Sequence, residues 1–275
     1  FGKANLLYYV SRNVINGLYG KLYYDLSDVK VNVKYVDNME KFKAFWKKLK
    51  RAEIAAVDTE TANGSVNHNA IHTIQFAFSR DKSYFIPVDH PDTPFSDAER
   101  KIIRKRLRTF FGAQPGEYAL KYLIAQYGIF DLRILRVCLG LPIIFHKCWE
   151  IQASTYLIDE NLKYLASKPF NTPHFGLEQI FMSYGNDFYS TAPFGKGDRA
   201  NANLTRLDNP DFIRYGGMDV QSCFAIHEVQ TQQAADMRIN DKSYKDDFVR
   251  LVLNQFDATV HRSEEHTSEL QSRQC

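Results

Sequence analysis

Hydrophobic and polar positions recur along this chain with two periods, one typical of helices and one typical of strands. After Asp37-Asn38, which can cap a helix, Phe42, Phe45, Trp46 and Leu49 recur at helical spacing, with lysines on the opposite side. Ser96 is a second candidate cap, for a helix that runs to about 111. The same reasoning predicts further helices at 131–139, 150–160, 174–184, 209–231 and 243–260.

Short apolar runs between these helices predict strands. Three come first, at 53–58, 72–79 and 83–88, and we expect the turn Arg80-Asp81-Lys82 to join the last two as a hairpin. Two more, at 117–124 and 142–148, each precede a helix. Three adjacent strands followed by strand–helix alternation predict an α/β fold with a mixed sheet flanked by helices. Residues 1–37 lack a clear period, so we interpret them as an extended or partly ordered lead-in.

Composition narrows the class of protein. A length of 275 residues with 44% hydrophobic residues fits one large domain, or one domain with an appendage. The net charge of +3 is too small to indicate a nucleic-acid partner by itself. The four cysteines lack metal-site spacing and indicate reduced thiols of a cytosolic protein. Without an apolar run of ~20 residues or a signal peptide, we expect a cytoplasmic protein.

Both ends of the sequence have unusual features. The chain opens on Phe1 rather than Met, which predicts that it starts inside a longer reading frame or after processing. Residues 262–272 read RSEEHTSELQS, and their back-translation resembles a common sequencing-adapter oligonucleotide read in one frame. We therefore interpret 262–275 as an adapter-derived tail that is not part of the fold. The alternative is a genuine polar tail.

Asp58 and Glu60 are the first candidates for chemistry. They follow the apolar run Ile54-Ala55-Ala56-Val57, and on a strand they would point to the same face. Two carboxylates on one face repel each other and lose solvation, and a divalent cation with hard oxygen ligands offsets both costs. The pattern alone is weak, because an Asp-x-Glu step usually lies on a solvated edge.

Further carboxylates follow downstream. Asp131 comes just after a predicted strand, where a helix cap is the alternative reading. Tyr215 and Asp219 lie four residues apart and share a helix face, where an ordinary exposed pair is the alternative. Between them, Gly216 and Gly217 each cost the helix roughly 1 kcal/mol relative to Ala. That cost predicts close packing of the helix against a strand, or close approach of a substrate.

In order along the chain, Asp58-x-Glu60, Phe130-Asp131 and Tyr215-x-x-x-Asp219 resemble the three motifs of the DEDD exonucleases, in the DEDDy subclass with a tyrosine in the third motif. The flanks look like the proofreading domain of family A (DNA polymerase I-like) DNA polymerases, phage versions included. These flanks are Phe85-Ile86-Pro87-Val88, Ala125-Gln126 and Tyr156-Leu157-Ile158. The resemblance covers about residues 35–232. Two positions depart from the family pattern, Tyr127 in place of Asn and Glu150 in place of Asp.

The resemblance implies a ribonuclease H-like fold and 3′→5′ exonucleolytic hydrolysis at DNA 3′ ends. It implies two Mg²⁺ ions, or Mn²⁺, with Asp58, Glu60 and Asp219 holding one ion. Asp58 would bridge to the second ion, Asp131 would support that ion directly or through water, and Tyr215 would orient the attacking water. The partners implied are a single-stranded DNA 3′ end and a polymerase domain of the same chain, in the cytoplasm of a bacterium or phage-infected cell.

The implied organisation is an exonuclease domain at 38–232 and, at 233–261, the helical start of a polymerase domain that this sequence does not contain. One alternative is a free-standing exonuclease similar to ribonuclease D or the Werner type, acting on RNA or structured DNA. Another is an inactive nucleic-acid-binding module, which the complete set of five site residues disfavours. On the second predicted strand, His72 and Gln75 could also face the site, although His72 is more often a structural residue.

Overall fold

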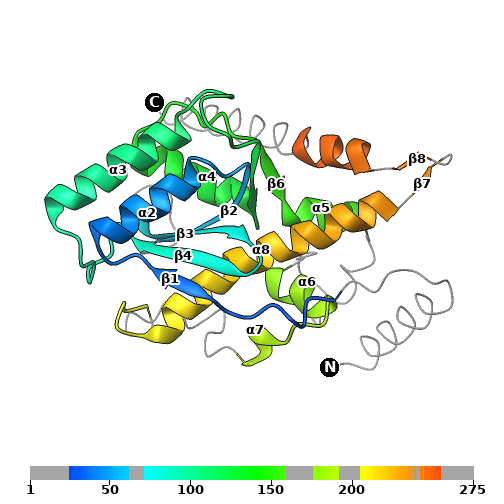
Figure 1. Cartoon of the computed structure of the whole chain (residues 1–275), viewed down its shortest axis with the longest axis horizontal. Coiled ribbons are helices and arrows are strands. Elements are labelled where there is room, and N and C mark those ends of the chain that lie inside the picture. Colours follow the sequence, from blue (N-terminus) through cyan, green and yellow to red (C-terminus); the bar gives the residue numbers. More distant parts are fainter. Residues whose placement is uncertain are drawn as a thin grey trace, which may run out of the picture.

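A six-stranded sheet with helices on both faces forms the centre of the molecule (Figure 1). The computed structural model describes residues 25–61, 71–158, 176–191, 205–236, 238–239, 242–243 and 245–254. The strands are ordered β1-β4-β3-β2-β5-β6. Their bounds are β1 (Val33–Tyr35), β2 (Ile54–Thr61), β3 (Ile71–Ser79), β4 (Lys82–Pro87), β5 (Tyr122–Ala125) and β6 (Cys148–Glu150).

The central three strands run antiparallel, and the outer strands run parallel to their neighbours. β2 pairs with β3, and β3 with β4, in the antiparallel sense, while β1, β5 and β6 add in parallel. This confirms the predicted α/β class with a mixed sheet of three antiparallel strands followed by parallel ones. The short strands β7 (Arg238–Ile239) and β8 (Lys242–Ser243) form a separate antiparallel pair.

Two helices begin at the capping residues that the sequence predicted. The Asn38 side chain accepts a hydrogen bond from the Lys41 amide, and Ser96 and Glu99 form a reciprocal capping box. The helices are α2 (Met39–Leu49), α3 (Asp97–Phe111), α4 (Gly128–Leu139), α5 (Ile151–Ile158), α6 (Leu177–Ser183), α7 (Phe188–Thr191) and α8 (Pro210–Asp236). Residues 245–254 are also helical.

Each face of the sheet has its own apolar core. Figure 1 shows α8 on one side of the sheet, with α2, α3 and α4 on the other. Along β2, Ala55 and Val57 belong to the core beneath α2, whereas Ala56 belongs to the core beneath α8. Because strand side chains alternate, the next residues continue this division. Asp58 and Glu60 therefore point toward the α8 face, and Thr59 points toward the opposite face.

Two glycines allow α8 to approach the sheet closely. A Cβ atom at Gly217 would lie 2.1 Å from Val33 Cγ2 and 2.8 Å from Ser83 Oγ. A Cβ atom at Gly216 would lie 3.0 Å from Gln75 Nε2 and from a Phe85 ring carbon. Of the two explanations for this glycine pair, close packing of the helix against strands is the one that the structure supports. The two glycines lower the helix propensity of α8, and they allow it to pack closely against the sheet.

Several boundaries differ from the sequence-based prediction. The lead-in proposed for 1–37 contains β1, which pairs in parallel with Ser83–Phe85 at the sheet edge. Three residues are too few to show a period, so only the pairing reveals this strand. The strands expected at 117–124 and 142–148 form only at Tyr122–Ala125 and Cys148–Glu150. Their length is set by register, because Leu123 pairs with Cys148 and Ala125 with Glu150.

The structure describes the two ends of the chain only in part. Residues 1–24 and 255–275, which include the proposed adapter-derived tail, lie outside the described residues. The helix expected at 243–260 is confirmed over 245–254, where the Phe248 ring packs 5.6 Å from the Trp149 ring. Its assignment to a polymerase domain stays a prediction. None of the helices in the described ranges combines the length and hydropathy of a membrane span.

Candidate active site

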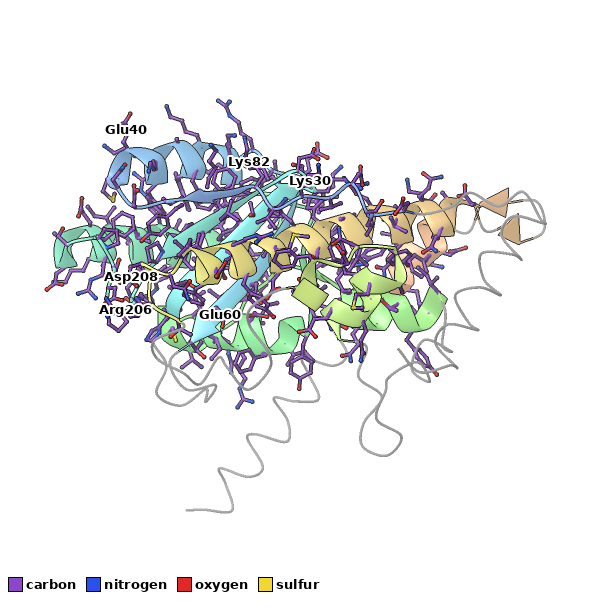
Figure 2. The ribbon with its side chains drawn as sticks, turned by 90° about the horizontal axis from the view of Figure 1, so that it is seen from below. Lys30, Glu40, Glu60, Lys82, Arg206 and Asp208 are labelled. Carbon is purple, nitrogen blue, oxygen red and sulfur yellow. The ribbon has the colours of Figure 1, made fainter. Side chains whose placement is uncertain are left out.

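Three carboxylates meet between β2 and α8. One ligand oxygen from each of Asp58, Glu60 and Asp219 lies within 4.8 Å of the others. Figure 2 shows Glu60 beside the yellow first half of α8. The strand period brings Asp58 and Glu60 to one face, and the glycine pair lets α8 bring Asp219 down to them. Three of the four predicted carboxylates therefore form one cluster.

Asp131 lies behind the same strand. It is in the first turn of α4, where it is 3% exposed, and its Oδ1 atom accepts two hydrogen bonds from Thr59. The Thr59 amide nitrogen lies at 3.0 Å and Thr59 Oγ1 at 2.6 Å. Tyr127 occupies the cap position of α4, so the reading of Asp131 as a helix cap is wrong. Among the described residues, Asp131 is not part of the mutual 4.8 Å group.

The Asp131 carboxyl group is in an unfavourable environment for a charge. Burial raises its pKa to about 7, the two Thr59 hydrogen bonds act to lower it, and the nearby Glu60 charge raises it further. The surrounding polypeptide therefore disfavours the charged form of the Asp131 carboxyl group. A divalent cation would offset both the repulsion and the lost solvation, and a set of carboxylate oxygens fits a hard cation.

Two tyrosines flank Asp219. Tyr215 lies one turn earlier on α8, is 4% exposed, and has its ring edge-on to Tyr189 at 5.9 Å. Tyr189 Oη donates a hydrogen bond of 2.7 Å to Asp219 Oδ1 and lies 3.1 Å from Ser222 Oγ. Burial and the Asp219 charge raise the pKa of Tyr189 well above its usual value, so it stays a protonated donor. The predicted Tyr215–Asp219 pair is therefore buried, not an ordinary exposed pair.

Sequence reasoning missed Tyr189 and Thr59. Tyr189 is on the four-residue helix α7, within a segment that contains many turn residues and no clear period. Its relation to Asp219, thirty residues away in sequence, arises only because α7 packs near α8. The position of Thr59 could have been predicted from the sequence. Strand alternation places its side chain on the sheet face opposite Asp58 and Glu60, toward the element that packs on that face.

The two departures from the exonuclease pattern meet at the start of α4. Tyr127 has a φ of 57°, the left-handed region that Asn adopts more readily than other non-glycine residues. Its amide donates to Glu150 Oε1 at 2.7 Å, and Glu150 Oε2 accepts from the Ala153 amide at 2.8 Å. Glu150 therefore ties the turn before Asp131 to the first turn of α5. Burial raises the pKa of Glu150, while these backbone hydrogen bonds act to lower it.

Strand β3 contributes a polar layer next to the carboxylates. Gln75 pairs with Asp58 across the ladder, and Thr73 pairs with Glu60, so each pair shares a sheet face. Gln75 is fully buried and donates to Thr73 Oγ1 at 2.6 Å. Gln75 Oε1 has no hydrogen-bond partner among the described residues. His72 instead packs edge-on against the His90 ring at 5.3 Å, which supports its structural reading.

Comparison with known proteins identifies the fold. Neither a protein-family model nor a curated protein matches the chain by sequence. The structure is similar to the Aedes aegypti Nibbler EXO domain, with a TM-score of 0.53, 16% identity and coverage of 84% of this chain and 98% of that one. It is similar to Brucella melitensis NrnC with bound Mg²⁺, with a TM-score of 0.50, 14% identity and coverage of 86% and 92%.

Escherichia coli RNase D, described as an exoribonuclease involved in structured RNA processing, matches with a TM-score of 0.51 and 11% identity. That match covers 84% of this chain and 50% of RNase D, so this chain spans about half of its length. At these identities the shared property is the fold. The protein has the ribonuclease H-like fold of exonuclease domains, which confirms the fold class that the motifs implied.

Proposed function

We propose that this protein is a metal-dependent 3′→5′ exonuclease that hydrolyses phosphodiester bonds at nucleic-acid 3′ ends. One observation carries the proposal: Asp58, Glu60 and Asp219 place ligand oxygens within 4.8 Å of one another in an exonuclease-type fold. An inactive binding module would gain nothing from this repulsive cluster. The order of the motifs along the chain supports the same conclusion.

Asp58, Glu60 and Asp219 would hold divalent cations, with Asp131 behind β2 supporting them directly or through water. We propose two Mg²⁺ ions, with Mn²⁺ as a substitute, since all these ligands are hard oxygens. The NrnC neighbour contains Mg²⁺. Bound cations would supply an activated water and would stabilise charge on the attacking and leaving oxygens.

The side chains around the cluster have positioning roles in this proposal. Tyr215 would hold the attacking water by a hydrogen bond, one helical turn from Asp219. Tyr189 keeps Asp219 oriented by donating to Oδ1. Thr59 keeps Asp131 oriented by donating twice to its Oδ1. Outer hydrogen bonds of this kind fix the direction in which a ligand carboxylate points.

The proposed substrate is a DNA 3′ end, in the manner of the editing domain of a family A DNA polymerase. The flanking sequences around the three motifs support this choice, and it implies a polymerase domain of the same chain as partner and a cytoplasmic setting. The second candidate is a free-standing exonuclease acting on RNA or structured DNA. The similarity to RNase D favours it, because that protein is an exoribonuclease.

A substrate comparison separates these candidates. Three 5′-labelled substrates of the same sequence are incubated with Mg²⁺: single-stranded DNA, duplex DNA with a mispaired 3′ nucleotide, and single-stranded RNA. Stepwise shortening of both DNA substrates, faster than that of the RNA substrate, supports the editing proposal. Faster shortening of RNA supports the second candidate. Binding of all three substrates without shortening of any would contradict both and indicate a binding module.

A further inference from the structure

A hollow of about 830 Å³ lies between α3 and the C-terminal end of α4. Four basic residues of α3 line one wall, Lys101, Arg104, Lys105 and Arg108. Their spacing of three, four and seven residues places them on one face of the helix. Cys138 and Leu139, at the end of α4, line the facing wall. We call this hollow the α3–α4 groove.

The charge of the groove is largely uncompensated. Within the described parts of the chain, Lys101, Lys105 and Arg108 form no ion pair, and all three are exposed. Arg104 is held in place by the Asp89 carboxylate and by the Cys138 carbonyl oxygen. Glu117 is the acidic residue of the lining. A concave surface with an excess of cations concentrates anions, and the phosphates of a nucleic-acid strand are spaced to meet such a row.

The groove is connected to the candidate active site through α4. Asp131 is in the first turn of this helix, and Cys138, seven residues later, borders the groove. Seven residues of helix rise about 10 Å. A stacked strand advances ~3.4 Å per nucleotide, so the groove would begin about three nucleotides from a 3′ end that lies at Asp131. In Figure 1, α3 and α4 lie on the same side of the sheet.

We propose that the α3–α4 groove binds the phosphate backbone of the strand whose 3′ end is hydrolysed, beginning about three nucleotides from that end. This inference rests on the proposed exonuclease function. It assigns the basic face of α3 to the handling of longer substrates. It predicts that dinucleotides and trinucleotides do not use the groove, whereas substrates of ten or more nucleotides do.

A second basic hollow provides a matched control. It measures about 550 Å³ and is lined by Lys47, Lys48, Arg51 and Lys82, with Phe78 and Tyr84. In Figure 2, Lys82 lies on the opposite side of the molecule from Glu60. This hollow is at the end of β2 where the strand begins, with Ala52 in its lining, whereas Asp58 and Glu60 are further along the strand. It has similar charge without a connection to α4.

The test compares two triple variants. Lys101→Gln/Lys105→Gln/Arg108→Gln removes three charges from the groove, and Lys47→Gln/Lys48→Gln/Arg51→Gln removes three from the control hollow. Binding of a fluorescent 12-nucleotide single strand is measured without divalent metal from 50 to 200 mM salt. The groove variant should bind at least tenfold more weakly at low salt, and its slope of log K against log salt should fall by about 2, from three lost phosphate contacts. The control variant should keep the wild-type slope.

The same variants are then compared on substrates of different length. The groove variant should lose kcat/KM on the 12-nucleotide strand and keep the wild-type value on a trinucleotide. Equal effects of both triple variants on binding would overturn the inference, because they would show unspecific charge attraction. An unchanged slope of log K against log salt in the groove variant would also overturn the inference. So would a groove variant that binds nucleic acid as the wild type does but no longer binds anionic lipid vesicles.

The outcome is separable from that of the exonuclease proposal. If wild-type protein hydrolyses the trinucleotide and the 12-nucleotide strand, and the groove variant does both equally well, the groove inference fails and the exonuclease proposal stands. If wild-type protein hydrolyses neither, the exonuclease proposal fails, and the salt-dependent binding difference still decides whether the groove holds a strand.

Discussion

Thr59 donates two hydrogen bonds to a single carboxylate oxygen of Asp131, at 3.0 Å from its amide and at 2.6 Å from its hydroxyl. Thr59 stands between Asp58 and Glu60 in β2 but points to the other face of the sheet. One stretch of three strand residues therefore presents two carboxylates on one face and anchors a third from the other. A small shift of β2 would move all three together.

Replacing Thr59 tests this anchoring. Thr59→Val keeps the volume and the amide donor but removes the hydroxyl, so the pKa of Asp131 should rise above its value of about 7. Exonuclease activity should fall about tenfold, as for other hydrogen bonds behind metal ligands, and its acidic limb should move to higher pH. The measurement is a pH–rate profile with Mg²⁺. Thr59→Ser, which retains the hydroxyl, should keep the wild-type profile, and an identical profile for Val would argue against the anchoring role.

Tyr189 provides a second test, on the opposite side of the cluster. Tyr189→Phe removes the donor to Asp219 Oδ1 and keeps the ring that packs against Tyr215. We expect the Mn²⁺ affinity, measured by titration calorimetry, to fall about tenfold or more, with a smaller change in unfolding temperature.

Tyr118→Phe is the control for Tyr189→Phe, because Tyr118 packs on Phe110, in the core on the other face of the sheet. It should leave the metal affinity unchanged. If both phenylalanine variants bind metal as the wild type does, Tyr189 has no positioning role.

The contact between α8 and the sheet predicts a stability effect. Gly217→Ala would place a methyl group 2.1 Å from Val33 Cγ2, so it should cost about 1–3 kcal/mol in the free energy of unfolding. Adding Val33→Ala removes both nearby valine methyl groups and should restore part of the loss. Urea unfolding of the two single variants and the double variant measures the coupling. Strictly additive effects would show that the two residues do not press on each other.

The parts of the fold that depend on local pattern were predictable from the sequence. The caps at Asn38 and Ser96, the β3–β4 hairpin and the α8 start at Pro210 all follow from neighbouring residues. β1 and the lengths of β5 and β6 were not predictable in this way. They depend on which backbone groups find a partner in another strand, and that is decided by tertiary packing.

In the candidate site, too, some residues were predictable from local sequence patterns and others depended on tertiary packing. Asp58, Glu60 and Asp219 were predicted from strand alternation and ordered motifs, and the structure brings them together. Asp131 was also predicted, but its position behind β2 was not. Tyr189 reaches Asp219 from a segment with no periodic signal, so no local pattern could reveal it. The glycine pair in α8 was the exception, since its propensity cost pointed correctly to a long-range contact.

Stability should depend on pH through His227. This ring is buried on α8, with Nε2 2.9 Å from Tyr122 Oη, and burial lowers its pKa to about 3. In the unfolded chain a histidine titrates near ~6.5, so the unfolded state takes up a proton first as pH falls. The stabilisation from a neutral His227 is complete above about pH 6.5 and is lost progressively toward pH 3, at ~1.4 kcal/mol per unit.

The measurement is the free energy of unfolding in urea between pH 7.5 and 4.5, for wild type and His227→Gln. Asp131 works in the opposite direction, because its raised pKa makes the folded state take up the proton first as pH falls from about 7. Both proteins contain Asp131, so their difference isolates the histidine. The wild type should lose more stability toward low pH than the glutamine variant. Parallel curves would show that His227 is not buried in its neutral form.

The most direct test of the central claim is hydrolysis by a protein that lacks the two β2 carboxylates. Wild type and Asp58→Ala/Glu60→Ala are incubated with a 5′-labelled single strand in Mg²⁺ and, separately, in EDTA. We predict stepwise loss of mononucleotides from the 3′ end by the wild type in Mg²⁺, and none in EDTA or by the double variant, which should still be folded by circular dichroism. Equal shortening of the strand by the folded double variant would contradict the proposed site.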